Sequence, residues 1–217
     1  YYLYSEAGNR LLAVRLGSAD GELLYRYVYD DEGRVVGKYD GEDNLMLGIV
    51  YDQRGLVSSM EVAGQTIHYG YDANGYRISK RSEAGERHYY LEGEHLESVT
   101  DGEGKLLAHY LRGVLVDELI NGFEVNAAGQ LENRSYHHDQ VNSVVAVSNH
   151  NGQLVQRTEY SPFGEVLSQE GDSINRMQYT GREYDPETGL YYYRARYYDP
   201  QIGRFLTEDP LGFAAGD

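Results

Sequence analysis

The chain has 217 residues and a formal net charge of −16, with 41% hydrophobic residues, 23 tyrosines and no cysteine or tryptophan. Its length suits one large or two small domains, the lack of cysteine excludes disulfide bonds, and no apolar run in this segment approaches the ~18 residues of a membrane span. The acidic charge, with no basic patch to offset it, argues against nucleic acid as a partner.

A short repeat occurs three times in the first part of the chain: YDDEGRVV at 29–36, YDQRGLVS at 51–58 and YDANGYRI at 71–78. Each copy has Tyr-Asp, two further residues, Gly and then an apolar-rich segment. In a type I turn, Asp, Asn or Ser at the first position accepts hydrogen bonds from the following backbone, and Gly at the fourth position takes a positive φ. The repeat therefore predicts β-hairpin turns with a bulge.

The same spacing of a capping residue and a glycine recurs along the chain. Its first residues are Ser5, Ser18, Asp30, Asp52, Asp72, Ser82, Asp101, Asn126, Asn149 and Ser161. Two longer variants insert proline after the aspartate, from Asp185 to Gly189 and from Asp199 to Gly203. The glycines for which we specifically expect a positive φ are Gly33, Gly55, Gly75 and Gly104.

The segments between the turns alternate polar and apolar residues or are rich in β-branched and aromatic ones, as in LLYRYVYD, TIHYGYD, SVVAVSN and LVQRTEY. They predict short strands, and no segment keeps a helical period over three turns. We therefore predict an all-β chain of consecutive antiparallel hairpins that forms part of a curled sheet, with one face packed and the other polar. Arginine far outnumbers lysine, which favours fixed, stacked or bidentate contacts.

The middle of the chain offers one candidate metal site, His137-His138-Asp139. Adjacent residues on a strand point to opposite faces, and no third ligand follows at a suitable spacing, so a metal site is disfavoured. The glycines at 102–104 and 171–173 do not precede a strand-to-helix step, and no serine lies in a nucleophile elbow. We predict neither a metal nor another cofactor.

Near the C-terminus, LYYYRARYYD at 190–199 is interpreted as one strand, with Arg194 and Arg196 on the same face. Asp199-Pro200 then begins a turn, and a simple hairpin would set Arg196 opposite Leu206. Arg204 is assigned to a strand face in the same way. Asp185 and Asp199 are assigned to turns.

Two long motifs carry a resemblance to a known family. They are YHHDQVNSVVAVSNHNGQLVQRTEYSPFGEVL and YTGREYDPETGLYYYRARYYDPQIGRFLTEDPLGF. Together with the Tyr-Asp repeats, they strongly resemble the Rhs/YD-repeat proteins, and the second matches the Rhs-associated core almost residue by residue. The resemblance covers essentially the whole chain. It divides the sequence into a YD-repeat shell segment at 1–175 and an Rhs-associated core at 176–217.

The resemblance implies a fold and a function. In that family, which includes toxin complex C-components, bacterial Rhs effectors and the related teneurins, the hairpins build a hollow β-shell around a C-terminal toxin. The expected partners are the remainder of the shell and the toxin, with a secretion system or a cognate shell as further candidates. The expected location is secreted or on the bacterial cell surface, although this segment opens without a signal peptide.

The resemblance also implies an aspartic autoprotease that releases the toxin, with its residues on Arg196 and Asp209 here. Such catalysis needs two carboxylates that share a proton, and a guanidinium can hold one of them ionised. Because the sequence ends at DPLGFAAGD, we expect it to hold at most an incomplete protease, without the second Asp or the scissile bond. From spacing alone, an ordinary ion pair that fastens two strands is the favoured interpretation of Arg196 and Asp209, and only the family resemblance favours the catalytic one.

A different class of function remains open at this stage. Aromatic-rich repeats stack on sugars, so the chain could be a carbohydrate-binding or cell-surface adhesion module with no catalytic role. That alternative requires tyrosines exposed at regular positions on an open surface. Tyrosines packed inside the fold would disfavour it.

Overall fold

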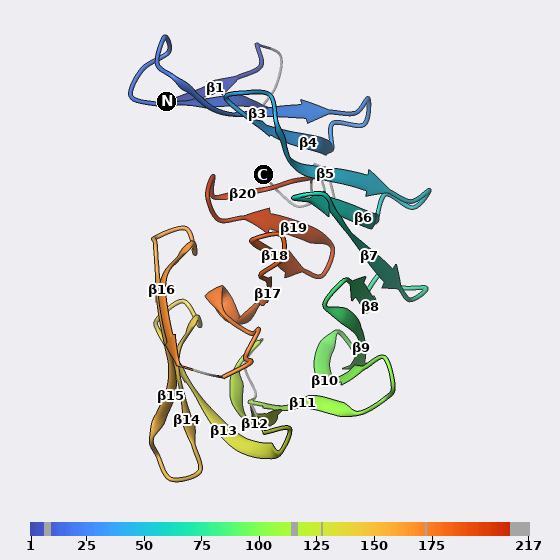
Figure 1. Ribbon diagram of the computed structural model, residues 1–217, viewed down its shortest axis with the longest axis vertical. Coiled ribbons are helices and arrows are strands. Elements are labelled where there is room, and N and C mark those ends of the chain that lie inside the picture. The colour runs from blue at the N-terminus through green and yellow to red at the C-terminus, as the bar shows by residue number, and fades with distance from the viewer. Residues whose placement is uncertain (7–9, 114–116, 127, 172, 209–217) are drawn as a thin grey trace. The chain divides into compact units, whose positions relative to one another are not determined.

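The computed structural model describes residues 1–6, 10–113, 117–126, 128–171 and 173–208. The described residues form two compact units: Tyr1–Tyr69 with 206–208, and Gly70–Phe205 (Figure 1). The division at 175/176 that the sequence motifs suggest stays a prediction.

The first unit is a run of antiparallel strands in chain order. They are β1 (Tyr2–Tyr4), β2 (Leu11–Arg15), β3 (Leu23–Tyr29), β4 (Val35–Asp40), β5 (Leu45–Tyr51), β6 (Val57–Val62) and β7 (Gln65–Tyr71, up to Tyr69 in this unit). Each strand is hydrogen-bonded to the strand before it through a hairpin. Leu47 and Ile49 on β5 are buried while Val50, the next residue on the same strand, is exposed, the alternation expected of a sheet with one packed face.

The second unit holds the other strands of this series and a second, smaller sheet. The series continues with β8 (Arg77–Ser82), β9 (Gly85–Glu92), β10 (His95–Asp101), β11 (Leu106–Arg112), β12 (Leu119–Val125), β13 (Leu131–His138), β14 (Val144–Asn149), β15 (Leu154–Tyr160) and β16 (Val166–Gly171). The smaller sheet is β17 (Glu183–Asp185), β18 (Leu190–Tyr193), β19 (Arg196–Asp199) and β20 (Arg204–Phe205), preceded by a short 3₁₀ turn at Tyr179–Gly181. All strand pairs within the unit are antiparallel.

The prediction of an all-β chain of consecutive antiparallel hairpins is confirmed. The 3₁₀ turn is the only helical element among the described residues. None of the elements described is a helix long and apolar enough to cross a membrane.

The Asp-x-x-Gly turns form as the sequence predicts. In the turn at 52–55, the N–H of Gly55 donates to the carbonyl oxygen of Asp52 at 3.0 Å, and the carboxylate of Asp52 accepts from the N–H groups of Arg54 and Leu56. The φ angles of Gly33, Gly55, Gly75 and Gly104 are 81°, 79°, 86° and 84°, which confirms the expectation. Turns with a positive-φ glycine and the same N–H to C=O bond also form from Asn126, Asn149 and Ser161.

Other turns depart from the pattern. Asp43 and Asn142 occupy the positive-φ position at 69° and 65°, a conformation that Asp and Asn tolerate better than other non-glycine residues, so the search for glycine missed both turns. The turn at Ser82 is a two-residue turn in which Ser82 pairs with Gly85. At Ser18 the positive φ falls on the preceding Gly17. The turn expected at Ser5 closes on Gly8, which lies outside the described residues.

The tyrosine of the repeat ties the end of one strand to the start of the previous one. Tyr29 and Tyr51 donate their hydroxyl hydrogens to the carbonyl oxygens of Leu11 and Val35 at 2.8 Å. The guanidinium of Arg34 lies 4.5 Å from the centroid of the Tyr51 ring, as the excess of arginine over lysine predicts. Tyrosine is therefore used in these repeats both for its ring and for its hydroxyl.

The packed face of the sheet in the second unit covers the C-terminal segment of that unit. Met177 lies in one hydrophobic cluster with residues of β9 to β14, including Tyr110 and Leu119. Three elements of the large sheet contact the segment 173–205. Arg77 on β8 forms an ion pair with Asp185, and the N–H of Val144 at the start of β14 donates to the carbonyl oxygen of Gln178. In the β15–β16 turn, the carbonyl oxygen of Gly164 accepts from the hydroxyl of Tyr191. The sheet of this unit must therefore curl around the segment.

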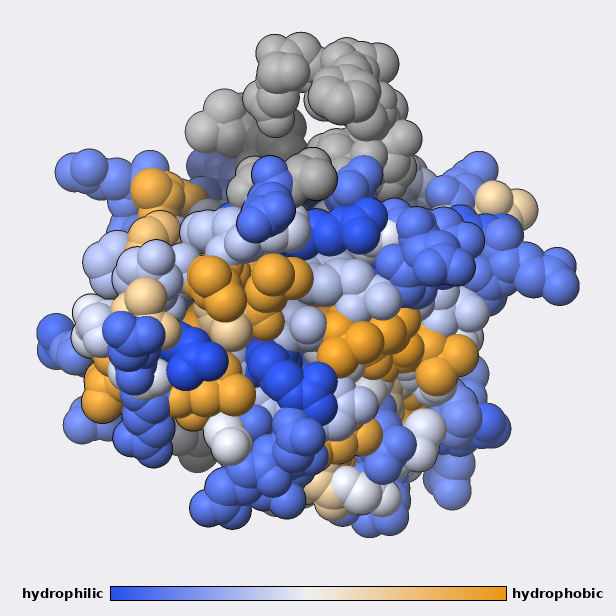
Figure 2. Space-filling view, turned by 90° about the horizontal axis from the view of Figure 1, so that it is seen from above, coloured by the Kyte–Doolittle hydropathy of each residue, from blue (hydrophilic) through white to orange (hydrophobic). Residues whose placement is uncertain are grey.

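The outer surface mixes apolar and polar side chains. On the face shown in Figure 2, hydrophobic residues gather in patches between hydrophilic ones. Large apolar side chains are exposed in both units, for example Leu16 in the first and Leu167 in the second. An excess of acidic side chains accompanies them, which favours solubility of the sheet.

Candidate functional site

The segment that carries the predicted site is a tight hairpin, which corrects the interpretation of 190–199 as one strand. β18 ends at Tyr193, Arg194 and Ala195 make the turn, and Tyr193 pairs with Arg196 at the start of β19. Arg194 has a φ of 62°, which a long side chain adopts infrequently. The sequence lacks the Asn-Gly or Gly signal that normally marks such a turn, and this is why the hairpin was not predicted.

Arg196 is half-buried at the start of β19, and its guanidinium lies 3.8 Å from the centroid of the Phe205 ring. The strands pair Tyr198 with Phe205 and Asp199 with Arg204, so the register differs by one residue from the expected pairing of Arg196 with Leu206. Asp209, the second predicted site residue, lies outside the described residues. The proximity of Asp209 to Arg196 therefore stays a prediction.

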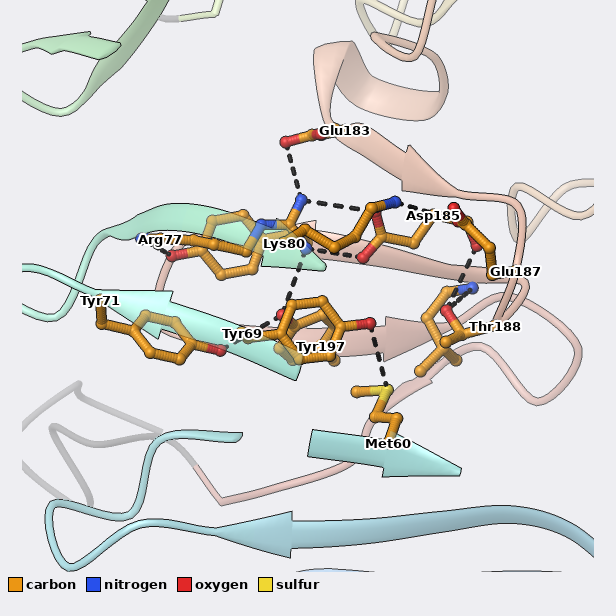
Figure 3. Close-up of polar contacts among 12 residues, drawn as sticks. Met60, Tyr69, Tyr71, Arg77, Lys80, Glu183, Asp185, Glu187, Thr188 and Tyr197 are labelled. Carbon is orange, nitrogen blue, oxygen red and sulfur yellow. Dashed lines mark hydrogen bonds and ion pairs between the residues drawn. The ribbon is translucent and has the colours of Figure 1, made fainter. Parts of the chain in front are cut away.

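The most prominent polar cluster in this unit is centred on Asp185, the first residue of a predicted turn. The turn forms, because the N–H of Gly189 donates to the carbonyl oxygen of Asp185 at 2.8 Å. The side chain, however, is fully buried and accepts from Arg77 Nη1 at 2.6 Å and from Lys80 Nζ at 3.0 Å (Figure 3). The assignment of Asp185 as a simple turn residue was therefore incomplete.

Two glutamates complete this buried charge cluster. Glu183 lies 2.8 Å from Arg77 Nη2, and Glu187 lies 3.0 Å from Lys80 Nζ. The two cations come from β8 and the three carboxylates come from β17 and the turn after it, as Figure 3 shows. The cluster therefore fastens β8 of the large sheet to β17, the first strand of the small one.

Aromatic rings surround the Arg77 guanidinium. Its Cζ lies 4.3 Å from the centroid of Tyr192, 5.0 Å from Tyr89 and 5.9 Å from Tyr197. The Tyr197 hydroxyl accepts from Arg77 Nη1 at 3.2 Å and also contacts the Tyr71 hydroxyl. Two tyrosines of the YYYRARYY motif, Tyr192 and Tyr197, thus enclose the Arg77 guanidinium together with Tyr89.

The electrostatics fix the charge states of this cluster. Burial alone would raise the pKa of Asp185, but Arg77 and Lys80 lower it to about 2. Burial would lower the pKa of Arg77, whereas Asp185 and Glu183 raise it well above its usual value. A carboxylate held ionised by two cations is a poor proton donor near neutral pH, so the arrangement suits a structural ion-pair network better than acid–base catalysis.

A second buried carboxyl, Glu124 on β12, has the opposite environment. It accepts from the hydroxyls of Tyr136 at 2.9 Å and Ser173 at 2.6 Å, while the nearest guanidinium nitrogen, from Arg134, is 3.9 Å away. Burial raises the pKa of Glu124, and the hydroxyls and Arg134 offset this only in part. Neither Glu124 nor Asp185 was singled out as a site residue from the sequence, because their partners are distant along the chain.

Other residues considered from the sequence have local roles. Asp199 begins the turn as predicted, with its carboxylate accepting from the N–H of Gln201 at 2.9 Å, although its side chain is buried. His137 Nε2 is hydrogen-bonded to the hydroxyl of Ser148, and His138 Nε2 is hydrogen-bonded to the carbonyl oxygen of Leu119. Within the described ranges, no three His, Cys, Asp or Glu side chains are placed to hold a metal ion.

Comparisons with known proteins agree with the fold. A family model described as Teneurin YD-shell matches residues 133–214. The chain is 29% identical over 217 residues to the tRNA nuclease WapA of Bacillus subtilis (strain 168), covering 99% of this chain and 8% of that protein. It is 26% identical over 228 residues to the toxin protein Tse5 of Pseudomonas aeruginosa, covering 99% of this chain and 17% of that protein.

Among solved structures, the chain is similar to the crystal structure of TcdB2-TccC3-TEV. The TM-score is 0.41 and the sequence identity is 17%, over 99% of this chain and 17% of that one. The chain thus spans less than a fifth of each of these proteins.

Proposed function

We propose that this chain is a wall segment of a β-shell that encloses a C-terminal toxin domain; its similarity to the Teneurin YD-shell family model and to the toxin protein Tse5 supports this. One observation carries the proposal: the large sheet of the second unit curls around the polypeptide segment 173–205 and buries it through contacts from β8, β14 and the β15–β16 turn. A wall of this kind provides a packed inner face on which enclosed chain can lie.

Protease protection tests the encapsulation. In the intact product of the natural gene, a domain downstream of this segment is expected to resist trypsin at concentrations that digest the same domain expressed alone. Digestion at equal rates would contradict the proposal. Fractionation of the producing cells tests the accompanying expectation that the protein is secreted or on the cell surface.

We further propose that this segment contributes Arg196 and Asp209 to an intramolecular aspartic autoprotease that releases the toxin. Asp209 would act as one of the two carboxylates that activate water and protonate the scissile carbonyl. The guanidinium of Arg196, held against Phe205, would keep one carboxylate ionised or stabilise the developing oxyanion. The second carboxylate and the scissile bond would come from elsewhere in the whole protein.

A gel of the natural gene product and four variants tests the protease. Asp209→Asn should abolish cleavage, because the amide cannot exchange a proton. Arg196→Ala should impair it, and Arg196→Lys should rescue little if the planar fork is needed. Asp101→Asn, which changes a partly exposed turn carboxylate to another turn-capping residue, is the matched control and should cut normally. Normal cleavage by folded Asp209→Asn would remove Asp209 from the mechanism.

The nuclease activity in the names of the Bacillus relatives is proposed to reside outside the matched segment. The match covers 8% of the Bacillus subtilis relative, and this chain carries a net charge of −16, which repels a polyanion. The chain is therefore expected to show no salt-sensitive binding to tRNA in a filter-binding assay. Micromolar binding at physiological salt would contradict this.

The carbohydrate-binding alternative gains no support from the tyrosines. In the repeats, the hydroxyls of Tyr29 and Tyr51 are used by backbone carbonyls within the fold, and Tyr89, Tyr110 and Tyr191 are buried. Sugar binding by stacking requires accessible ring faces at regular positions.

A further inference from the structure

A second polar cluster in the Gly70–Phe205 unit surrounds a small cavity and is separate from Arg196. The cavity has a volume of about 40 Å³. Four of its lining side chains are guanidiniums: Arg77 on β8, Arg112 at the end of β11, Arg182 before β17 and Arg194 in the β18–β19 turn. Such a convergence of arginines is unexpected in a chain with a net charge of −16.

One carboxylate serves two of these arginines. Asp117 accepts from Arg194 Nη2 through Oδ1 at 2.7 Å, and its Oδ2 lies 2.7 Å from Arg182 Nη2. Both oxygens of Asp117 are thus occupied. Arg194 has a second, weaker partner in Glu94, 3.3 Å away at the rim of the cavity, where the Glu94 side chain is 45% exposed.

Arg112 has no carboxylate of its own in the described part of the chain. Its Nε donates to the carbonyl oxygen of Leu96 at 3.3 Å, while its Nη1 is buried without a hydrogen-bond partner. A buried, unpaired donor on a cation is costly, and native structures normally satisfy such a group with protein, water or a bound ion.

The charge count around the cavity is positive. Arg77 and Glu183 also line it and neutralise each other as an ion pair, which leaves three arginines against Asp117 and Glu94. The environment agrees with this excess: burial lowers the pKa of both Arg112 and Arg182, Asp117 opposes the shift, and the neighbouring guanidiniums add to it. An added negative charge would therefore relieve the cluster.

We propose that this cavity binds a carboxylate, with Arg112 Nη1 as its main donor and Arg182 and Arg194 supplying the surrounding positive potential. The size of the cavity selects this ligand, because a water-sized group needs about 10–15 Å³ and the three heavy atoms of a carboxylate therefore match the available space. A nucleotide or a sugar is too large. The carboxylate could come from a small acid in solution or from a Glu or Asp side chain of an enclosed polypeptide, since the chemistry is the same.

Saturation-transfer NMR with sodium formate as the probe tests the proposal on the 217-residue chain. We expect saturable binding with a dissociation constant in the millimolar range. Arg112→Gln should reduce the saturation transfer at least fivefold. Arg112→Lys, which keeps the positive charge but loses the planar guanidinium and its paired N–H donors, should give an intermediate value. Arg157→Gln removes an exposed arginine from β15 in the same unit and should bind formate like the wild type.

Thermal unfolding provides a second readout that does not require equal stability of the variants. Formate, exchanged against fluoride at constant sodium, should raise the unfolding midpoint of the wild type and of Arg157→Gln but not that of Arg112→Gln. Equal formate responses in all three proteins, or no saturable binding to the wild type, would overturn the proposal and leave a water-filled cavity.

Competition distinguishes the two sources of carboxylate. If the cavity accepts acidic side chains, N-acetylglutamate amide should displace formate while N-acetylglutamine amide should not. Failure of the glutamate derivative to displace bound formate would exclude a polypeptide side chain and restrict the site to small acids from solution.

Discussion

The dipeptide Tyr-Asp occurs in two regions of the molecule with different consequences. At Tyr51-Asp52 in the repeats, the aspartate lies at the surface and its carboxylate accepts from backbone N–H groups two and four residues ahead. At Tyr184-Asp185 in the small sheet, the aspartate also starts a turn, but its carboxylate is buried against Arg77 and Lys80, more than a hundred residues away in sequence. The same two residues thus close a local turn in one place and join two sheets in the other.

The difference is one of partners rather than of turn chemistry. The pKa of Asp52 is lowered by backbone N–H groups and Arg54 against a burial effect that raises it, all within four residues. Asp185 is completely buried, and it stays ionised only because β8 places two cations, Arg77 and Lys80, beside it. Loss of a local cap weakens one hairpin, whereas loss of the buried carboxylate removes a partner that two buried cations share.

The largest effect is expected for Asp185→Asn. Removal of this charge takes away the buried carboxylate that Arg77 and Lys80 share and leaves each cation with one glutamate partner, which should lower the free energy of unfolding by about 3–5 kcal/mol. Urea denaturation followed by circular dichroism measures it. Asp52→Asn is the matched control and should change stability by less than about 0.5 kcal/mol, because asparagine also caps such turns. Equal effects of the two changes would show that Asp185 acts only as a turn residue.

The next effect is the dependence of stability on pH. The pKa of Asp185 is depressed to about 2 in the fold and is about 3.9 in an unfolded chain, so its stabilisation is complete above about pH 4 and is lost as the pH falls through about 2. This contribution amounts to about 2.5 kcal/mol. Glu124 acts in the opposite direction, because its raised pKa makes protonation favour the folded state.

Urea denaturation at several pH values isolates the contribution of Asp185 to the pH dependence of stability. Between about pH 4 and pH 2, the wild type should lose stability more steeply than Asp185→Asn, since the variant lacks the titrating group. Parallel curves for the two proteins would indicate that Asp185 is not ionised by its neighbours in the fold.

The local region was predictable from the sequence and the non-local region was not. Asp-x-x-Gly spacing determined the turns at Asp30, Asp52 and Asp72, since every interaction involved lies within a few residues. The burial of Asp185 depends on the curl that brings β8 to β17, and no local signal encodes it. The β18–β19 turn was also missed, because Arg194 adopts a positive φ without a glycine.

A smaller effect is expected at the glycine of a repeat turn. Gly55 has a φ of 79°, where a β-branched side chain is strained, so Gly55→Val should lower the free energy of unfolding by about 1–3 kcal/mol. Gly55→Asn should cost less than Val, because Asn142 already occupies the equivalent position of another turn at a φ of 65°. Both are measured by urea denaturation. Equal losses from valine and asparagine would mean that positive φ is not what the site requires.

The smallest effect concerns the tyrosine of the repeat, and it separates the role of the hydroxyl from that of the ring. Tyr51→Phe removes the hydrogen bond to the carbonyl oxygen of Val35 but keeps the ring beneath Arg34, so it should lower the free energy of unfolding by about 1 kcal/mol.

Tyr90→Phe, at an exposed tyrosine on β9, is the control for Tyr51→Phe and should have no measurable effect. Tyr51→Leu should lose more than Tyr51→Phe, because it also removes the cation–π contact with Arg34. If Tyr51→Phe unfolds at the same urea concentration as the wild type, the ring alone explains why tyrosine stands before the turn aspartate. The hydroxyl would then contribute nothing measurable to stability. The Tyr-Asp step would be stabilised by the aspartate cap of the turn and by the contact between the tyrosine ring and Arg34.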